Sequence, residues 1–404
     1  MTTEATATGP PGPAAGPAGP PAGPPAGPAA GPGGRDDATE LAEARSFVRM
    51  HARHMGLGDE AVAATLSRIA RLSGDGPDGW CAVWRAEADR RAAAGEHRAA
   101  ADLYNLARFP VADSPARTRA AQASADSLAR WLAATGRGQR RSAPAAGTSV
   151  PFVFRPGRRP SSPLVIVMGG IVSMKEQWAS FLGPAGRLGV AIALVDFPGV
   201  GENALRYDRD AAGVFAAVMA AVDGDCDPGR TLLFASSFGG HLALLAAGRD
   251  ERVRGIVTVG APLSVFFTDP SARAAMPAIT RAALGHTTGR SGDGLDGALA
   301  ALALRPAELS AVTAPVTYVA SLRDEIIPAA DWREAGAALP DLAVYAFDDV
   351  HASPHHLRHT RLLTTIALLE HAGRPRLARL ARAVGRRRLG LEPLAREPLP
   401  GKES

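Results

Sequence analysis

One stretch decides the fold of this 404-residue chain: Thr231-Leu-Leu-Phe-Ala-Ser-Ser-Phe-Gly-Gly-His241. An apolar run of strand length leads into Ser237, and a helical pattern follows it. The residue two positions before this serine is Ala235, and the residue two positions after it is Gly239. A nucleophile held in a sharp strand-to-helix turn needs small residues at both positions, because the chain approaches itself closely there. The stretch therefore predicts a nucleophile elbow with Ser237 at its tip.

Five further apolar runs of strand length surround the elbow in the sequence, and helical patterns lie between them. Most are rich in Val, Ile and Leu without alternation, which is typical of strands covered on both faces. Strands that alternate with helices predict an α/β fold with a mostly parallel sheet and right-handed crossovers. The six runs, with that of the elbow, are residues 164–168, 190–195, 231–235, 255–259, 315–320 and 342–347.

Composition divides the chain into four segments. Residues 1–37 are mostly Pro, Gly and Ala and predict a disordered tail. Residues 38–145 have helical periodicity and predict a helical N-terminal cap, with residues 136–147 interpreted as a polar linker. Residues 146–372 hold the six runs and predict the catalytic domain. Residues 373–404 form a basic tail.

The positive charge of the chain is concentrated in that basic tail. The net charge is +5, and residues 373–404 carry eight Arg and one Lys against three Glu, so the rest of the chain is close to neutral. This distribution argues against a nucleic-acid-binding domain. The tail has an apolar stripe at helical spacing, which predicts packing on the body or a partner, with a membrane-surface helix as the alternative. The stripe comprises Leu377, Leu380, Ala381 and Val384.

The two cysteines, Cys81 and Cys226, are too few for a disulfide framework or a Cys-based zinc site. A reduced, cytoplasmic setting fits this usage. No run of about 18 apolar residues is present, so no integral membrane segment is expected. We expect no metal and no cofactor, and a homodimer stays open as an alternative to a monomer.

Ser237 needs a base and an orienting carboxylate, since a serine hydroxyl alone is a poor nucleophile. Asp324 and His351 each follow the end of one of the last two strand-length runs. The chain order serine, acid, histidine is the one expected when the nucleophile lies on such an elbow. We predict His351 as the base and Asp324 as the acid, with Glu325 as the competing acid.

Backbone N–H groups should stabilise the oxyanion that forms when a carbonyl is attacked. Phe238, directly after the serine, is predicted to supply one such group. Gly170 or Ile171, in the glycine turn that ends the run 164–168, is predicted to supply the other. The alternative is a glycine turn needed only for backbone shape.

Four further histidines lie close in sequence to Ser237 or His351. His241, on the elbow helix, is expected to pack in the core. A group close to His351 is interpreted as surface or capping histidines, with substrate contact by one of them as an alternative. A His-rich metal site is a second, disfavoured alternative, because no carboxylate–histidine spacing there is persuasive. This group comprises His355, His356 and His359.

The segment 266–304 is interpreted as a mobile insertion over the site, with an ordinary connection as the alternative. Asp269, near its start, is a candidate for substrate contact.

Four stretches carry a resemblance to the α/β-hydrolase superfamily and, within it, to the FrsA-like esterase group, which includes dihydroxypseudooxynicotine hydrolase. The resemblance implies an α/β-hydrolase fold preceded by a helical segment, and triad roles for Ser237, Asp324 and His351. It also implies that the loop 196–201 lines the site, which makes Asp196 a substrate-binding candidate. Trp178, at the end of the stretch Met168–Trp178, is a second substrate-binding candidate. The stretches are Met168–Trp178, Val195–Glu202, Ala235–Gly240 and the pair Trp80–Trp84.

Two positions depart from the pattern of that group. Ala235 stands where glycine is usual, and Met168 stands where wider α/β hydrolases often have histidine. Neither change removes a predicted catalytic group.

Three functions are compatible with these features to different degrees. The first is a serine hydrolase that cleaves an ester or activated carbonyl of a small, largely apolar metabolite. The second is a lyase with the same triad. It follows from the resemblance, since related tetronate-pathway enzymes of secondary metabolism expel acetate from an acylated ring. The third, a non-catalytic binding protein, is disfavoured because all three triad residue types are present in the right order.

Overall fold

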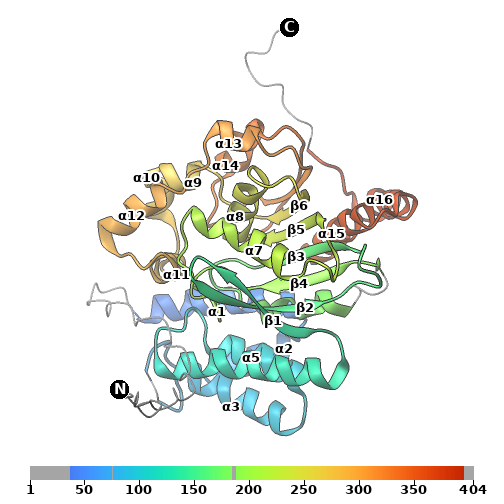
Figure 1. The fold of residues 1–404 in the computed structure, drawn as a ribbon. Coiled ribbons are helices and arrows are strands. Elements are labelled where there is room, and N and C mark those ends of the chain that lie inside the picture. Colours follow the sequence, from blue (N-terminus) through green and yellow to red (C-terminus); the bar gives the residue numbers. More distant parts are fainter. Residues whose placement is uncertain (1–36, 75, 184–187, 395–404) are drawn as a thin grey trace, which may run out of the picture.

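The computed structural model describes residues 37–74, 76–183 and 188–394. The predicted tail 1–37 lies outside these residues except for Asp37, which begins the first helix. Figure 1 shows a twisted sheet flanked by helices, with a separate layer of helices below it. Within the described residues, none of the helices combines the length and apolar character that a membrane crossing requires.

In the described part of the chain, the sheet has eight strands in the order β1-β2-β4-β3-β5-β6-β7-β8. The neighbours from β4 to β8 in this order pair in parallel, and all six runs predicted as strands lie in them. The mostly parallel sheet confirms the predicted fold class. These six strands are β3 (Pro163–Met168), β4 (Ala191–Val195), β5 (Asp227–Ser236), β6 (Val253–Val259), β7 (Val316–Ser321) and β8 (Leu342–Phe347).

The interpretation of residues 136–147 as a linker was wrong. Strand β1 (Gln139–Ala145) lies there and forms an antiparallel hairpin with β2 (Thr148–Arg155), which adds to the sheet beside β4. The turn between them has positive φ at Ala146 (46°) and Gly147 (77°), as a two-residue hairpin turn requires. β1 is an edge strand with mostly exposed side chains, so its sequence has no apolar pattern to reveal it.

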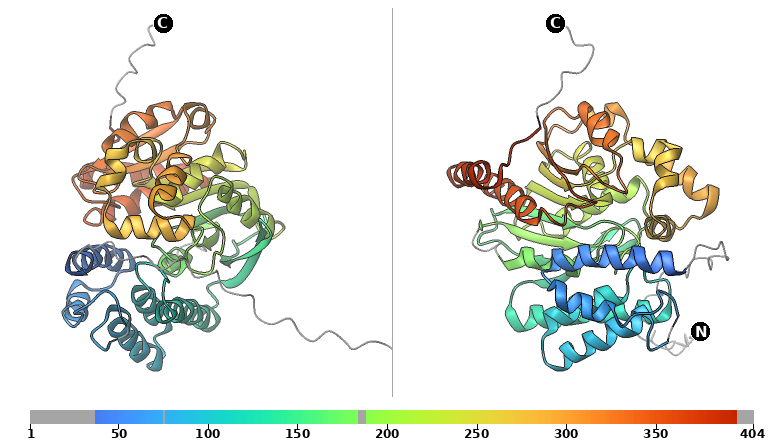
Figure 2. Two further views of the ribbon diagram at one scale, coloured as in Figure 1. Left: turned by 90° about the vertical axis from the view of Figure 1, so that its left-hand side faces the viewer. Right: turned by 180° about the vertical axis from the view of Figure 1, so that it is seen from behind.

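Within the described residues, five helices precede the sheet, in agreement with the predicted helical N-terminal segment. Figure 2 shows the long helix α1 lying between the sheet and the other helices of this segment. Helices α1, α4 and α5 all contact the 3-10 helix η1 (Lys175–Phe181), which follows β3. We call these five the cap helices: α1 (Asp37–Met55), α2 (Asp59–Leu66), α3 (Trp80–Ala93), α4 (His97–Ala107) and α5 (Pro115–Thr135).

The remaining helices cover the sheet and its upper end. The segment 266–304 is largely helical in the structure, and its mobility stays a prediction. Its start is fixed by Asp331, whose buried carboxylate accepts the backbone N–H groups of four successive residues, 263–266, at 2.6–3.0 Å. These helices are η2 (Asp210–Ala212), α7 (Gly213–Ala221), α8 (Phe238–Ala247), α9 (Val265–Thr268), α10 (Pro270–Ala275), α11 (Ala278–Thr288), α12 (Gly292–Ala300), α13 (Pro306–Ser310), α14 (Ala329–Arg333), η3 (Ala335–Ala338), α15 (Leu357–His371) and α16 (Pro375–Leu389).

The basic tail contains helix α16, which packs against α15. The packed side of α16 is made by its small residues: Ala378 is buried against Ile366 and Leu369. Most of the predicted apolar stripe points elsewhere, since Leu377, Leu380 and Val384 are 47%, 62% and 43% exposed. The membrane-surface alternative for this helix stays a prediction.

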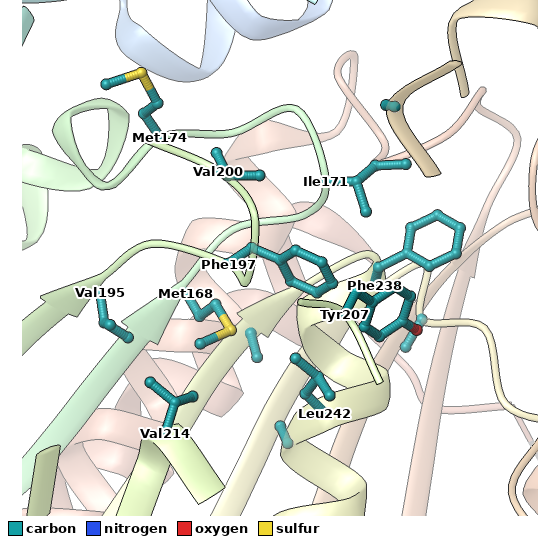
Figure 3. Packing of buried hydrophobic residues seen from close by; sticks show 14 of the residues in the cluster. Met168, Ile171, Met174, Val195, Phe197, Val200, Tyr207, Val214, Phe238 and Leu242 are labelled. Carbon is teal, nitrogen blue, oxygen red and sulfur yellow. The ribbon is translucent and has the colours of Figure 1, made fainter. Parts of the chain in front are cut away.

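The core between the sheet and α8 ends in a group of aromatic rings below the elbow. Figure 3 shows Phe197, Tyr207 and Phe238 gathered there, with Ile171 above Phe238. The rings of Phe197 and Tyr207 lie 4.8 Å apart, and those of Tyr207 and Phe238 lie 6.2 Å apart. Phe238 therefore anchors the start of α8 in the core, directly after Ser237.

Candidate active site

The turn at Ser237 has the strained backbone expected of a nucleophile elbow. Ser237 lies between β5 and α8 with φ 54° and ψ −131°, a conformation that side-chain-bearing residues rarely adopt. A Cβ atom at Gly239 would lie 2.4 Å from the carbonyl oxygen of Gly169, and one at Gly240 would lie 2.1 Å from Thr258 Oγ1. The two glycines after the serine are thus required by close approach to β3 and β6.

The structure brings Ser237, His351 and Asp324 together from three separate loops. Ser237 Oγ lies 2.9 Å from His351 Nε2, and His351 Nδ1 lies 3.0 and 2.9 Å from the two carboxylate oxygens of Asp324. A neutral His351 that donates from Nδ1 to Asp324 presents its Nε2 lone pair to the serine hydroxyl. The three side chains form one continuous hydrogen-bonded chain.

The two neighbouring acids take different positions around His351. Asp324 contacts the imidazole, and its Oδ1 also accepts the N–H groups of Ile326 and Ile327, each at 2.9 Å. Glu325 instead accepts the backbone N–H of His351 through Oε2 at 3.0 Å. The geometry therefore favours Asp324 over its competitor as the orienting acid, while Glu325 holds the histidine loop.

The pKa of His351 is raised above its ordinary value. Burial alone would lower this pKa, but the negative charge of Asp324, its hydrogen bond and the charge of Glu325 outweigh burial. The site therefore favours the imidazolium form, which a general base becomes when it takes a proton.

The loop after β3 lies against the serine on the other side. A Cβ at Gly170 would lie 2.9 Å from Ser237 Cβ and 3.2 Å from Ser237 Oγ, so only glycine fits there without displacement. The loop is closed by a hydrogen bond from Ser173 N to Gly170 O at 3.1 Å. The cap contributes Arg108, which is 2% exposed and donates from Nη2 to the carbonyl oxygen of Val172 at 2.5 Å.

Of the residues predicted to stabilise the oxyanion, Gly170 lies beside Ser237, Ile171 follows it in the same loop, and Phe238 comes directly after the serine. Phe238 begins helix α8, whose N-terminal backbone N–H groups carry partial positive charge. Their roles as oxyanion donors stay predictions, as do the catalytic roles of the triad.

The three residues predicted to bind substrate have contacts within the protein. Asp196 is fully buried and accepts hydrogen bonds from Lys175 and Glu202. Trp178 packs on Phe234 with ring centres 5.5 Å apart, and its indole nitrogen lies beside the glycine loop, 2.7 Å from the place that a Cβ at Gly169 would take. Asp269 is the N-cap of α10, and its carboxylate accepts the backbone N–H and the hydroxyl group of the residue two positions on, each at 2.8 Å.

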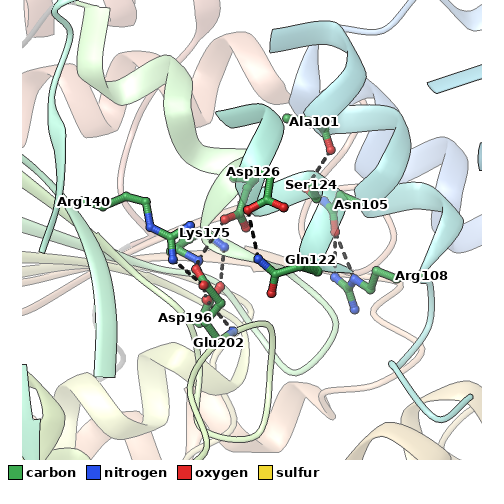
Figure 4. Close-up of polar contacts among 11 residues, drawn as sticks. Ala101, Asn105, Arg108, Gln122, Ser124, Asp126, Arg140, Lys175, Asp196 and Glu202 are labelled. Atoms are coloured by element: carbon green, nitrogen blue, oxygen red, sulfur yellow. Dashed lines mark hydrogen bonds and ion pairs between the residues drawn. The ribbon is translucent and has the colours of Figure 1, made fainter. Parts of the chain in front are cut away.

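A buried ion cluster supports the glycine loop, and sequence reasoning did not find it. Figure 4 shows Lys175 surrounded by acidic side chains. Lys175 Nζ lies 2.9 Å from Asp196 Oδ2, 2.8 Å from Glu176 Oε1 and 2.6 Å from Glu202 Oε2, while its backbone N–H donates to Asp196 Oδ1 at 2.6 Å. Lys175 is 2% exposed. One sequence signal was available: the chain has only two lysines, and this one comes five residues after Gly170.

The charges of this cluster determine its pKa values. Burial lowers the pKa of Lys175, but the three carboxylates outweigh burial and raise it. Burial raises the pKa of Glu176, and the charge of Asp196 adds to that increase. Lys175 is therefore the cation on which the buried carboxylates depend.

His241, His355 and His356 have polar partners within the protein. His241 is buried, with Nε2 2.8 Å from Leu302 O and Nδ1 2.9 Å from the Tyr207 hydroxyl, which confirms its place in the core. His355 and His356 both lie 2.8 Å from the buried carboxylate of Asp349. In the part of the chain that the structure describes, no group of three or more His, Cys, Asp or Glu side chains is placed to hold a metal ion.

Comparisons with known proteins give the family. The Esterase FrsA-like family model matches residues 80–306. The solved structure "AbyA5 Wildtype" is 38% identical, with a TM-score of 0.80, over 85% of this chain and 98% of that one. A second AbyA5 structure is 40% identical, with a TM-score of 0.75, over 80% and 97%.

The solved structure of 2,6-dihydroxy-pseudo-oxynicotine hydrolase is 18% identical, covers 80% of this chain and 93% of its own, and has a TM-score of 0.62, which shows the shared fold. A search of curated proteins found no match. The resemblance expected from the sequence is confirmed: the chain belongs to the FrsA-like esterase family and is an enzyme with the α/β-hydrolase fold.

Proposed function

We propose that this protein is a serine hydrolase that cleaves an ester or activated carbonyl of a small, largely apolar metabolite. The observation that supports it best is the hydrogen-bonded chain from Ser237 Oγ through His351 to Asp324, with both imidazole nitrogens within 2.9–3.0 Å of their partners. A chain of this kind activates a hydroxyl that would otherwise be a weak nucleophile.

The proposed mechanism has two halves. Ser237 Oγ attacks the carbonyl carbon while His351 Nε2 takes the hydroxyl proton, and Asp324 stabilises the imidazolium that results. The imidazolium returns the proton to the leaving alcohol, and an acyl-enzyme remains. Water then attacks this ester with His351 again as base, and the acid is released. The backbone N–H groups of Phe238 and of Gly170 or Ile171 stabilise the oxyanion in both halves.

The burial of the site supports a small substrate. Ser237 is 9% exposed and His351 is 4% exposed, which suits a small molecule that enters the site. The adjacent Ile171 and Phe238 side chains are also buried, which gives the reacting group apolar neighbours. Exclusion of water strengthens the electrostatic contacts that stabilise charge in the transition state.

A fluorophosphonate probe tests the proposal directly, because it labels only an activated serine. We expect the wild-type protein to be labelled once per chain and the Ser237→Ala variant not at all. Ser236→Ala is the matched control, since this neighbouring hydroxyl is just as buried and lacks the contact with His351. Labelling of Ser237→Ala at the wild-type rate would refute the assignment.

The same triad supports a second reaction, elimination of acetate from an acylated intermediate. The observation that favours it is the raised pKa of His351, which makes this residue a stronger base, one able to take a proton from carbon next to a carbonyl. The C–H bond breaks, a C=C bond forms, and acetate leaves with the C–O electron pair; no water is consumed. The resemblance to tetronate-pathway enzymes points to the same reaction.

Product mass separates the two reactions on one acetylated substrate. Hydrolysis gives an alcohol and, in labelled water, acetate that carries one ¹⁸O atom. Elimination gives an alkene that lacks the elements of acetic acid and acetate without the label. The Ser237→Ala variant gives a second criterion, because only hydrolysis requires an acyl-enzyme.

The pH dependence of hydrolysis follows from the raised pKa of His351. The base must be neutral, so kcat/KM should fall as pH decreases, with a midpoint above the ~6.5 of an ordinary imidazole. Glu325→Gln should move this midpoint downward, since the variant keeps an oxygen acceptor for the His351 N–H but loses a charge that raises the pKa.

Asp348→Asn removes an exposed charge from the start of the loop that carries His351, and it should leave the midpoint of the pH profile unchanged. Profiles of kcat/KM between pH 5 and 9 measure both shifts. An unchanged midpoint in Glu325→Gln would mean that the charge of this carboxylate does not raise the pKa of His351.

A further inference from the structure

Helix α1 of the cap places two histidines against η1, the helix that follows the glycine loop. His51 and His54 are three residues apart and therefore lie on one face of α1. His51 pairs with Gln177 of η1, and His54 packs on Trp178 of the same helix. The indole nitrogen of Trp178 lies 2.7 Å from the place that a Cβ at Gly169 would take. The pair therefore lies on the glycine-loop side of the site.

The tautomer of His51 follows from its partner. His51 Nδ1 lies 3.1 Å from Gln177 Oε1, which can only accept, so Nδ1 carries the proton. Nε2 of a neutral ring is then an unprotonated acceptor. The side chain is 6% exposed, and this nitrogen has no hydrogen-bond partner among the described residues.

His54, on the next turn, also has a ring nitrogen without a partner. Its Nε2 is buried and, within residues 37–74, 76–183 and 188–394, has no hydrogen-bond partner. The ring packs edge-on against Trp178, with centres 6.3 Å apart.

Both rings are neutral at physiological pH. Burial and the neighbouring imidazole lower the pKa of His51 to about 3, and burial and Arg361 lower that of His54 to about 4. The charge of a protonated His351 also lowers both pKa values. Two neutral rings, each with a buried nitrogen that lacks a partner, destabilise the site unless a bound molecule supplies the missing hydrogen bonds.

We infer that His51 and His54 bind hydroxyl groups of the substrate, so that the enzyme selects hydroxylated esters over their deoxy analogues. This inference rests on the proposed hydrolase function and specifies its substrate class. A carboxylate or phosphate is disfavoured, because a neutral acceptor has nothing to offer an anion. A site built to pair with a hydroxyl rejects the analogue without it, because its own polar atoms are then left unpaired.

The test compares two esters that differ by one hydroxyl, 4-nitrophenyl 3-hydroxybutanoate and 4-nitrophenyl butanoate. We expect the wild-type enzyme to favour the hydroxylated ester at least tenfold in kcat/KM. His51→Phe and His54→Phe should bring this ratio at least halfway toward one on a logarithmic scale, while kcat/KM for the plain ester changes less than threefold. His51→Gln, which keeps an amide oxygen as an acceptor, should restore part of the preference.

His97→Phe at the start of α4 is the matched control, and its ratio should equal that of the wild type. A wild-type ratio near one, or an equal loss for both esters in the two variants, would overturn the inference. Fluorophosphonate labelling of Ser237 should stay at the wild-type rate in both variants. If the probe does not label the wild-type protein, the proposed hydrolase function is wrong. The role of the two histidines is then tested by binding: the affinities of the two esters are measured for Ser237→Ala with and without His51→Phe. The same preference for the hydroxylated ester, lost in the His51→Phe background, is expected.

Discussion

Replacing Ser237 with alanine should lower kcat for ester hydrolysis by about four to six orders of magnitude, and His351→Ala should cost about as much. Each variant breaks the same hydrogen-bonded chain, since the two side chains meet at 2.9 Å. Residues that act as one unit are not additive: once the nucleophile is missing, the base has nothing left to activate. The double variant should therefore be no slower than either single variant.

Steady-state kinetics of the three variants with 4-nitrophenyl esters measure these effects, and thermal melting confirms that each variant is folded. Additive losses in the double variant would mean that the two residues act separately. A Ser237→Ala enzyme that keeps most of its activity on an acetylated substrate would instead favour elimination, in which His351 works without an acyl-enzyme.

Lys175→Met should lower the free energy of unfolding by about 3–5 kcal/mol, because it leaves buried carboxylates without their cation. Asp196 and Glu176 are both fully buried, and Lys175 lies within 2.6–2.9 Å of a carboxylate oxygen of each of its three partners. Urea unfolding at pH 7 measures the loss. Arg382→Met, which breaks the half-exposed pair with Glu370, is the matched control and should cost no more than about 1 kcal/mol.

The pH dependence of this loss gives a second test. Without the lysine, the folded-state pKa values of the carboxylates rise, so the unpaired cluster gains stability as pH falls and protons bind. The difference between wild type and variant should therefore be smaller at pH 5 than at pH 7. A loss that is equal at both pH values would indicate lost packing around the lysine stem and not unpaired charge.

The sequence contained most of the information about the elbow and much less about its surroundings. Residues 231–241 predict the strand, the turn and the helix because close approach to neighbouring strands requires small residues at fixed positions. Strand β1 escaped prediction, since an edge strand with an exposed Arg140 and a half-buried Arg141 carries no apolar signal. Several partners of Lys175 and Arg108, such as Asp196 and Val172, are distant in sequence, and no local pattern encodes such contacts.

The roles of the two acids after β7 show the same limit. The position after the strand predicts that one of Asp324 and Glu325 orients the histidine. The two residues are adjacent, so their spacing does not tell which one does. Only the backbone path decides, because it directs the first side chain to the imidazole and the second to the peptide N–H of His351. The local spacing of residues does not reveal that backbone path.

The Arg108 contact has a practical consequence for anyone who wishes to shorten this enzyme. The guanidinium donates to the peptide of Val172 and to its own helix through Asn105 Oδ1, at 2.8 Å, as Figure 4 shows for the latter. A truncated gene product that begins at β1 would keep every residue of the triad yet lose the clamp that fixes the peptide beside the nucleophile. Minimal versions for screening or directed evolution should therefore retain the cap helices.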